Sequence, residues 1–313
     1  MSEFEPEGIY PALPTPISED GTINYGASEE HIRYLEEEGG VQGVVPAGCT
    51  GHAATLGDRG GIFDEHVEYI ARVSEMTDLP VIGGTGMNST RQTIELASEV
   101  EKEADVDAHL VISPYQNCPP QDLIVEHYRI LADELKEPLI AYNVPGRTGR
   151  NIEADTTMQL AEIEGVIGMK EASLDYEQIH EIGHRIQGRD DIESFNLGSG
   201  DDSANHFVFE QGGTFGISVS GNVHPEAVVE VWEKGYREQN HQAAFERNRE
   251  LMPLHDAMFQ AGEKNPLSVQ YALNLMGFDF GTPRMPLSRE PREDEEYQNQ
   301  AELREVLDGF DLL

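Results

Sequence analysis

The chain has 313 residues, and 38% of them are hydrophobic, which suffices for one substantial core. It carries 59 acidic and 21 basic side chains, so its net charge is −38. Nucleic acids and anionic membrane surfaces are bound mainly through lysine and arginine, and this charge therefore excludes both as partners.

Eight short apolar runs, typical of buried strands, alternate with longer amphipathic segments. The expected strands cover residues 8–13, 43–48, 79–84, 108–113, 138–143, 166–170, 192–197 and 214–219. The segments between them include expected helices at 28–39, 64–76, 90–104 and 121–135. Buried strands joined by helices predict an α/β fold, a closed (β/α)₈ TIM barrel. The alternative, a doubly wound sheet, would need a phosphate-binding fingerprint that the sequence does not offer.

Strand signals stop after residue 222. Four later segments have helical periodicity, at 224–239, 241–262, 266–277 and 293–310. We therefore expect a barrel over residues 1–222 and a C-terminal helical region, residues 223–313, packed on it.

The two cysteines, Cys49 and Cys118, are too few for a disulfide framework and indicate a reducing compartment. The N-terminus has acidic residues and no basic start before an apolar stretch, and no run of about 18 apolar residues occurs. These features predict a cytoplasmic protein. Its acidity indicates work in concentrated salt, which screens the repulsion between carboxylates; the alternative is a merely acidic protein of ordinary salt.

Lys170 stands out among the five lysines of the chain, because the other four lie in charged helical contexts. It closes the run VIGMK, and catalytic groups of a barrel sit at the C-terminal ends of its strands. Burial lowers the pKa of an amine, and a neutral amine can attack a ketone to form an imine without a metal. The alternative is a salt bridge from Lys170 to the neighbouring Glu171.

The preceding strand contributes Tyr142 near its C-terminal end, and adjacent barrel strands would bring it near Lys170 as a proton-transfer group. Taken singly, a tyrosine in this position is more often a packing residue. Arg147 follows in a PGRTG turn, where its guanidinium suits a carboxylate, although an ordinary loop cation is equally consistent with the pattern.

The second strand runs into GCTG, where glycines flank Cys49 and Thr50. Backbone N–H groups freed by such glycines, together with the Thr50 hydroxyl, suit the carboxylate of a 2-keto acid, though a GxxG turn alone is weak support. A nucleophilic Cys49 is disfavoured, because no histidine and aspartate partners can be identified. The histidines show no metal-binding spacing, so we expect no metal site and no cofactor.

Eight motifs, taken together and in order, resemble the dihydrodipicolinate synthase/N-acetylneuraminate lyase superfamily. They are GCTG (48–51), GGTGMNST (83–90), PYQNCP (114–119), YNVPGRTG (142–149), GMKEAS (168–173), GSGDD (198–202), GISVSGNV (216–223) and NPLSVQYALNLMG (265–277). The resemblance spans nearly the whole chain. It implies a (β/α)₈ barrel with C-terminal helices, a homotetramer built as a dimer of dimers, and small-molecule substrates: a 2-keto acid, held as a Schiff base, and an aldehyde.

The resemblance also implies individual roles. Lys170 would form the imine, Tyr142 would transfer protons, and Arg147 would meet the carboxylate of aspartate semialdehyde. Four further positions would lie beside the bound keto acid: Cys49, Thr50, Gly200 and the main chain of Ile217.

Three positions depart from the synthase pattern, among them His52 in place of the usual glutamate, and two of the three, Cys49 and Gln116, are relay positions. The usual GTTGE reads GCTGH, with Cys49 for the first threonine, and the usual PYYN reads PYQN, with Gln116 for the second tyrosine. In the family that tyrosine crosses the dimer interface and joins the threonine and the phenol in a proton relay. A thiol is a weak donor and an amide cannot shuttle a proton as a phenol does, so the relay is altered while imine chemistry is not.

The closest branch condenses pyruvate with aspartate semialdehyde, and this reaction is our leading expectation. The altered relay favours a rival, an aldolase for 2-keto-3-deoxygluconate or its 6-phosphate. A dehydratase of a 2-keto-3-deoxy sugar acid would use the same imine. A non-catalytic barrel that senses pyruvate-like ligands is the alternative outside enzymes.

Overall fold

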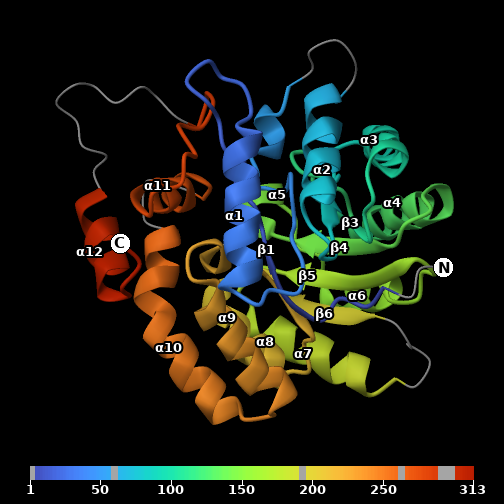
Figure 1. Ribbon diagram of the computed structural model, residues 1–313. Helices are drawn as coiled ribbons and strands as arrows, with labels where there is room; N and C mark the ends of the chain where they lie inside the picture. Colours follow the sequence, from blue (N-terminus) through green and yellow to red (C-terminus); the bar gives the residue numbers. More distant parts are fainter. Residues whose placement is uncertain (1–3, 58–62, 190–194, 260–264, 288–299) are drawn as a thin grey trace.

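The core of the computed structural model is one parallel, curled sheet of seven strands (Figure 1). The structure describes residues 4–57, 63–189, 195–259, 265–287 and 300–313. The strand order in the sheet is β1-β7-β6-β5-β4-β3-β2. The strands are β1 Gly8–Pro11, β2 Ile82–Gly84, β3 Ala108–Ile112, β4 Leu139–Asn143, β5 Val166–Glu171, β6 Asn196–Ser199 and β7 Phe215–Ser218.

A short extended segment, residues 44–46, lies between the two edge strands of this sheet. Val45 bridges Ala12 just beyond β1, and Val44 bridges Val81 just before β2, both in parallel orientation. Backbone hydrogen bonds run from Val45 N to Pro11 O at 2.9 Å and from Ile82 N to Val44 O at 3.0 Å. The segment thus contacts both edges, but its pairing is limited to isolated bridges.

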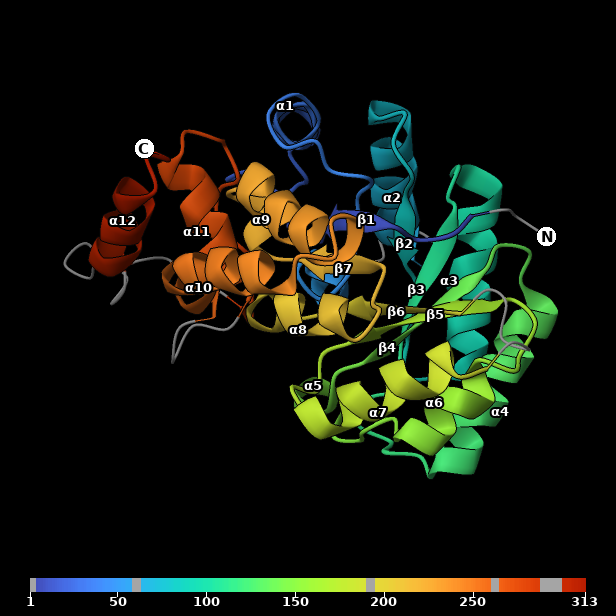
Figure 2. The same ribbon diagram turned by 90° about the horizontal axis from the view of Figure 1, so that it is seen from below.

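Helices follow the strands along the chain and surround the sheet, as expected of strands that are buried on both faces (Figure 2). Those of the first part are α1 Tyr25–Glu37, α2 Asp64–Met76, α3 Thr90–Glu103, α4 Gln121–Glu134, α5 Pro145–Thr148, α6 Ala154–Leu160, α7 Tyr176–Gln187 and α8 Asn205–Glu210. The later ones are α9 Pro225–Trp232, α10 His241–Met258, α11 Leu267–Leu275 and α12 Gln300–Gly309.

Seven of the eight expected strands, and the expected helices within the described residues, are observed with shifted ends. The segment 43–48 forms bridges in place of a full strand. The strand expected at 192–197 is observed as β6, which runs on to Ser199, while residues 192–194 lie outside the described residues. Residues 293–299 of the last expected helix, and Lys264, also lie outside them.

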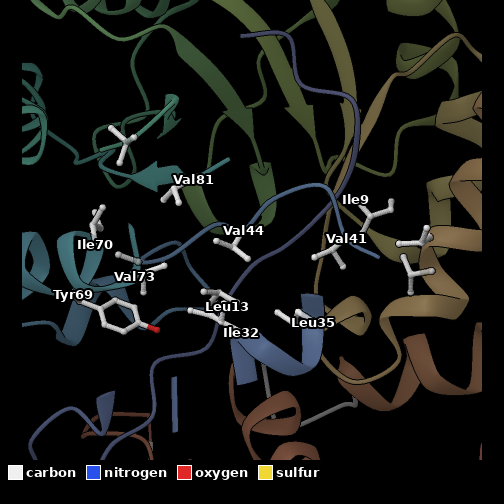
Figure 3. Close-up of a cluster of buried hydrophobic side chains, with 14 of the residues drawn as sticks. Ile9, Leu13, Ile32, Leu35, Val41, Val44, Tyr69, Ile70, Val73 and Val81 are labelled. Carbon is white, nitrogen blue, oxygen red and sulfur yellow. The ribbon is translucent and has the colours of Figure 1, made fainter. Parts of the chain in front are cut away.

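Hydrophobic side chains fill the space on both sides of the curled sheet. One cluster contains inward-facing residues of successive strands, among them Tyr10, Leu110, Ile140, Tyr142 and Phe215. A larger cluster lies where α1 and α2 pack on the first part of the sheet (Figure 3). This two-sided burial fixes the strand ends, where the candidate active-site residues lie.

The C-terminal helices α10, α11 and α12 lie together on one side of the molecule (Figures 1 and 2). Helix α9, by contrast, packs on the sheet: Trp232 is fully buried in the same cluster as Ile9 of β1. Its Nε1 donates a hydrogen bond to Thr214 O at 2.8 Å. Among the described residues, no helix is both long enough and apolar enough to cross a membrane.

Candidate active site

Strand β5 holds Lys170 at the centre of the candidate site. Lys170 pairs with Tyr142 on β4 and with Gly198 on β6. Its side chain is 5% exposed, although it is a charged residue type. Because side chains alternate along a strand, Lys170 and its neighbour Glu171 point to opposite faces of the sheet.

The amine of Lys170 lies over the ring of Tyr142, with Nζ 4.3 Å from the ring centroid. Burial lowers the pKa of Lys170 to about 8, and the carboxylates of Asp202 and Asp201 oppose this shift. Burial also raises the pKa of the Tyr142 hydroxyl well above its usual value, so the phenol keeps its proton. A partly neutral amine therefore sits beside a protonated phenol, as proton transfer to a nascent imine requires.

The salt bridge between Lys170 and Glu171, considered as an alternative from the sequence, is wrong. The Glu171 carboxylate accepts hydrogen bonds from Asn143 Nδ2 at 2.9 and 3.1 Å, from Gln178 Nε2 at 3.1 Å and from Ser173 N at 2.6 Å. These donors lie on β4, on α7 and in the loop before α7. Glu171 thus links β5 to β4 and α7 through these hydrogen bonds, and it does not pair with the amine of Lys170.

The GCTG turn follows the segment 44–46 and lies beside Tyr142. The half-buried Cys49 packs against the cluster that contains Tyr142, and it contributes to the raised pKa of the Tyr142 hydroxyl. Thr50 is 3% exposed, and its Oγ1 accepts a hydrogen bond from Asn265 Nδ2 at 2.9 Å. Thr15 stabilises the turn, because its Oγ1 donates a hydrogen bond to Gly51 O at 2.6 Å.

Arg147 lies on the short helix α5, which directly follows β4. Its side chain is exposed, and Nη2 donates to Asn265 O at 3.0 Å. Asn265 therefore forms hydrogen bonds with both Arg147 and Thr50. Asn265 opens the motif NPLSVQYALNLMG, but its role could not be predicted from the sequence, because the contact joins segments far apart along the chain.

Gly200 provides the space that the side chain of Lys170 occupies. A Cβ atom at this position would lie 2.9 Å from Lys170 Cγ and 3.0 Å from Lys170 Cε. Such distances are too short for carbon atoms, so any larger residue would displace the lysine. The expected place of Gly200 in the site thus has a steric basis.

Ile217 and Gln116 lie in different surroundings. Ile217 is buried on β7, opposite Tyr10, in the inward-facing cluster that also contains Tyr142. Gln116 is exposed in the loop after β3 and adopts a positive φ of 68°. Its expected role across a subunit interface stays a prediction.

Asp202, the last residue of the GSGDD motif, lies near Lys170, and no role for it was predicted from the sequence. It is 1% exposed, and its carboxylate accepts hydrogen bonds from Ser218 Oγ at 2.5 Å and from the backbone N–H groups of Val219 and Ser220 at 2.9 and 2.8 Å. These bonds tie the end of β6 to the end of β7. The GSGDD motif was the signal for this residue.

Within the described part of the chain, no group of three or more histidine, cysteine, aspartate or glutamate side chains is arranged to hold a metal ion. The candidate site comprises the Lys170 amine, the Tyr142 phenol and the donors of the GCTG turn.

The sequence model of the dihydrodipicolinate synthetase family matches residues 5–306. The chain belongs to this family. It is 40% identical over 307 residues to the 4-hydroxy-tetrahydrodipicolinate synthase of Archaeoglobus fulgidus, covering 98% of this chain and 99% of that protein. The family predicted from the motifs is therefore confirmed, and with it the prediction of an enzyme of the lyase/synthase type.

Solved structures of dihydrodipicolinate synthetase family members have the same fold. The dihydrodipicolinate synthase of Thermotoga maritima aligns with a TM-score of 0.89 at 33% identity, over 99% of this chain and all of that one. The enzyme of Acinetobacter baumannii, solved in complex with pyruvate, aligns with a TM-score of 0.88 at 32% identity, over 98% and 99% of the two chains. The parallel α/β architecture is thus shared across the family.

Proposed function

We propose that this chain is a 4-hydroxy-tetrahydrodipicolinate synthase, which condenses pyruvate with aspartate semialdehyde through an imine on Lys170. The observation that carries the proposal is the buried amine of Lys170. Its pKa is lowered to about 8, and its Nζ lies 4.3 Å from the centroid of the Tyr142 ring. The names and coverage of the relatives support the same reaction.

The first half of the reaction uses the residues around Lys170. The neutral amine attacks the C2 carbonyl of pyruvate, and the resulting carbinolamine loses water to give a protonated imine. Tyr142 donates and accepts the protons of these steps. The Thr50 hydroxyl and the backbone N–H groups of Cys49 and Thr50 hold the pyruvate carboxylate.

The second half forms the new carbon–carbon bond. The protonated imine draws electrons from C2, so that C3 loses a proton and the enamine attacks the aldehyde carbon. Arg147, anchored on Asn265 O, has further guanidinium donors for the carboxylate of aspartate semialdehyde. Gly200 and the main chain of Ile217 border the keto acid. No metal or organic cofactor takes part in this scheme.

The altered relay bears on the choice of aldehyde. Cys49 packs against the cluster that contains Tyr142, so a thiol, which is a weak donor, takes the place of the first relay threonine beside the phenol. The names of the relatives support the synthase over the aldolase and dehydratase alternatives, which the loss of the relay would favour.

The proposed function is tested with a panel of second substrates. The enzyme is incubated with pyruvate and with aspartate semialdehyde, glyceraldehyde or glyceraldehyde 3-phosphate, and pyruvate consumption is followed; 2-keto-3-deoxygluconate is supplied separately to detect dehydration. We expect turnover of aspartate semialdehyde. Turnover of glyceraldehyde or its phosphate, with no turnover of aspartate semialdehyde, would instead identify the chain as an aldolase.

Borohydride trapping tests the imine itself. Reduction in the presence of pyruvate, followed by peptide mass spectrometry, is expected to show a covalent adduct on Lys170. Absence of the adduct would remove every imine-based proposal, whereas an adduct without turnover of any substrate would support a pyruvate sensor.

The rate of imine formation is expected to rise with pH and to level off above about pH 8. Only the neutral amine attacks pyruvate, and with a pKa of about 8 its fraction grows about tenfold per pH unit below that value. An unburied lysine would instead keep gaining reactivity up to about pH 10. Stopped-flow or quenched borohydride trapping between pH 6 and pH 10 measures the profile, and a rise that continues to pH 10 would contradict the lowered pKa.

We further propose that the bridges of residues 44–46 make this segment the eighth strand of a (β/α)₈ barrel. The barrel comprises residues 1–222, and residues 223–313 form the helical region packed on it. The hydrogen bonds from this segment to both edges of the sheet support the closure.

Assembly and environment complete the proposal. The protein forms a homotetramer, a dimer of dimers, with the exposed Gln116 at a contact between copies. It works in the cytoplasm at high salt, because a net charge of −38 needs screening to limit self-repulsion.

A further inference from the structure

Asn265 connects two parts of the candidate site that come from opposite ends of the chain. It lies just before α11 in the C-terminal helical region and is 5% exposed. Its side chain donates to Thr50 Oγ1 at 2.9 Å, and its backbone carbonyl accepts from Arg147 Nη2 at 3.0 Å. In the proposed function, Thr50 binds pyruvate and Arg147 binds the aldehyde, so one residue contacts the binding groups of both substrates.

The hydrogen bond from Asn265 determines which acceptors remain possible for the Thr50 hydroxyl proton. A hydroxyl has one hydrogen to donate and two lone pairs to accept with. Because Asn265 Nδ2 donates to Oγ1, it occupies a lone pair of Thr50 and accepts nothing from it. The Thr50 proton is therefore left available for the carboxylate of a bound keto acid.

The two contacts of Asn265 are chemically separate. The contact with Thr50 uses the side-chain amide, whereas the contact with Arg147 uses the backbone carbonyl, which every amino acid has. A substitution at this position therefore removes the support of Thr50 while a carbonyl remains for Arg147.

We propose that Asn265 is a positioning residue for the keto-acid site, which orients the Thr50 hydroxyl toward the pyruvate carboxylate. The proposal rests on the proposed function, since it needs Thr50 to bind pyruvate. The C-terminal helical region would then contribute to the keto-acid site, because Asn265 supplies the buried donor to the Thr50 hydroxyl.

The test compares Asn265→Ala with Asn265→Asp. Asn265→Ala is expected to raise the KM for pyruvate about 10-fold, the effect of one well-placed hydrogen bond. Asn265→Asp is expected to raise it about 100-fold, because a carboxylate accepts the Thr50 proton and repels the pyruvate carboxylate. The KM for aspartate semialdehyde is expected to stay within about twofold of the wild-type value in Asn265→Ala, since the carbonyl that Arg147 uses is retained and no charge is added.

Asn274→Ala is the matched control. Asn274 is an asparagine of α11 whose side chain donates to Gly281 O at 2.8 Å and accepts from Phe280 N at 2.9 Å. Its loss disturbs the same region without touching Thr50, so the KM for pyruvate should not change. Melting temperatures are recorded for all variants, and Asn265→Ser replaces Asn265→Ala if the latter does not fold.

A double-mutant cycle with Thr50→Val separates positioning from a general structural effect. If Asn265 acts through the Thr50 hydroxyl, Asn265→Ala adds no further penalty on the KM for pyruvate once that hydroxyl is gone. A full additional penalty, or equal rises in both KM values, would overturn the proposal. Borohydride trapping of the wild-type Lys170 adduct reports on the proposed function separately, so its failure is distinguishable from failure at Asn265.

Discussion

Replacing Lys170 with methionine is expected to abolish turnover of pyruvate, a loss of at least about 10³-fold in kcat/KM. Methionine has a similar length and leaves the space beside Gly200 filled, but it has no amine to form the imine. Turnover is measured by pyruvate consumption, and the borohydride-trapped adduct is sought by mass spectrometry. Residual turnover above about one-tenth of the wild-type value would show that the reaction does not pass through this lysine.

The same variant is expected to be more stable than the wild type at neutral pH. The pKa of Lys170 is about 8 in the folded chain and about 10.5 in an unfolded one. Folding therefore disfavours the charged form; the penalty is complete below pH 8 and disappears as pH rises to about 10.5. Lys170→Met should raise the free energy of unfolding by about 1–3 kcal/mol at pH 7, with a smaller gain at pH 10.

Lys102→Met is the matched control for both effects. Lys102 is an exposed lysine on α3, and its Nζ lies 2.6 Å from Glu99 Oε1. Its replacement should leave activity unchanged and alter stability by less than about 0.5 kcal/mol. A drop in activity for this variant would mean that loss of positive charge, and not loss of the nucleophile, affects turnover.

Replacing Tyr142 with phenylalanine is expected to lower kcat about 10²- to 10³-fold. Phenylalanine keeps the ring over which the Lys170 amine lies, but it removes the hydroxyl that we propose transfers protons. The adduct on Lys170 should still form, only more slowly. Single-turnover trapping of the adduct, combined with steady-state kinetics, measures both steps.

Tyr128→Phe is the control for the loss of a buried phenol. Tyr128 is fully buried, and its hydroxyl donates to Val111 O at 2.8 Å between α4 and β3. Its loss should cost about 1 kcal/mol of stability without a change in kcat. If the two variants lose activity equally, the role of Tyr142 in proton transfer is refuted.

Local patterns in the sequence were enough to locate Lys170 and Tyr142. Each lies at or near the C-terminal end of an apolar run, and parallel strands of one sheet bring such ends to the same edge. The order of the motifs over the whole chain then identified the family, which the family model and the relatives confirm. These strand ends could be located because a strand buried on both faces has a continuous run of apolar residues.

Contacts between distant segments could not be predicted in the same way. That Glu171 turns to Asn143 and Gln178, and not to Lys170, depends on which face of β5 lies inward, and a run buried on both faces does not indicate this. The hydrogen bond from Asn265 to Thr50 joins residues 215 positions apart, and no periodicity along the chain reports it.

The sequence by itself thus determined the strand order along the chain, the family and the lysine with its phenol, because these follow from local apolar patterning and motif identity. Only the tertiary structure decided which groups surround that lysine. The pKa of Lys170 near 8, the space beside Gly200 and the support of Thr50 by Asn265 all arise when distant segments pack together and exclude water.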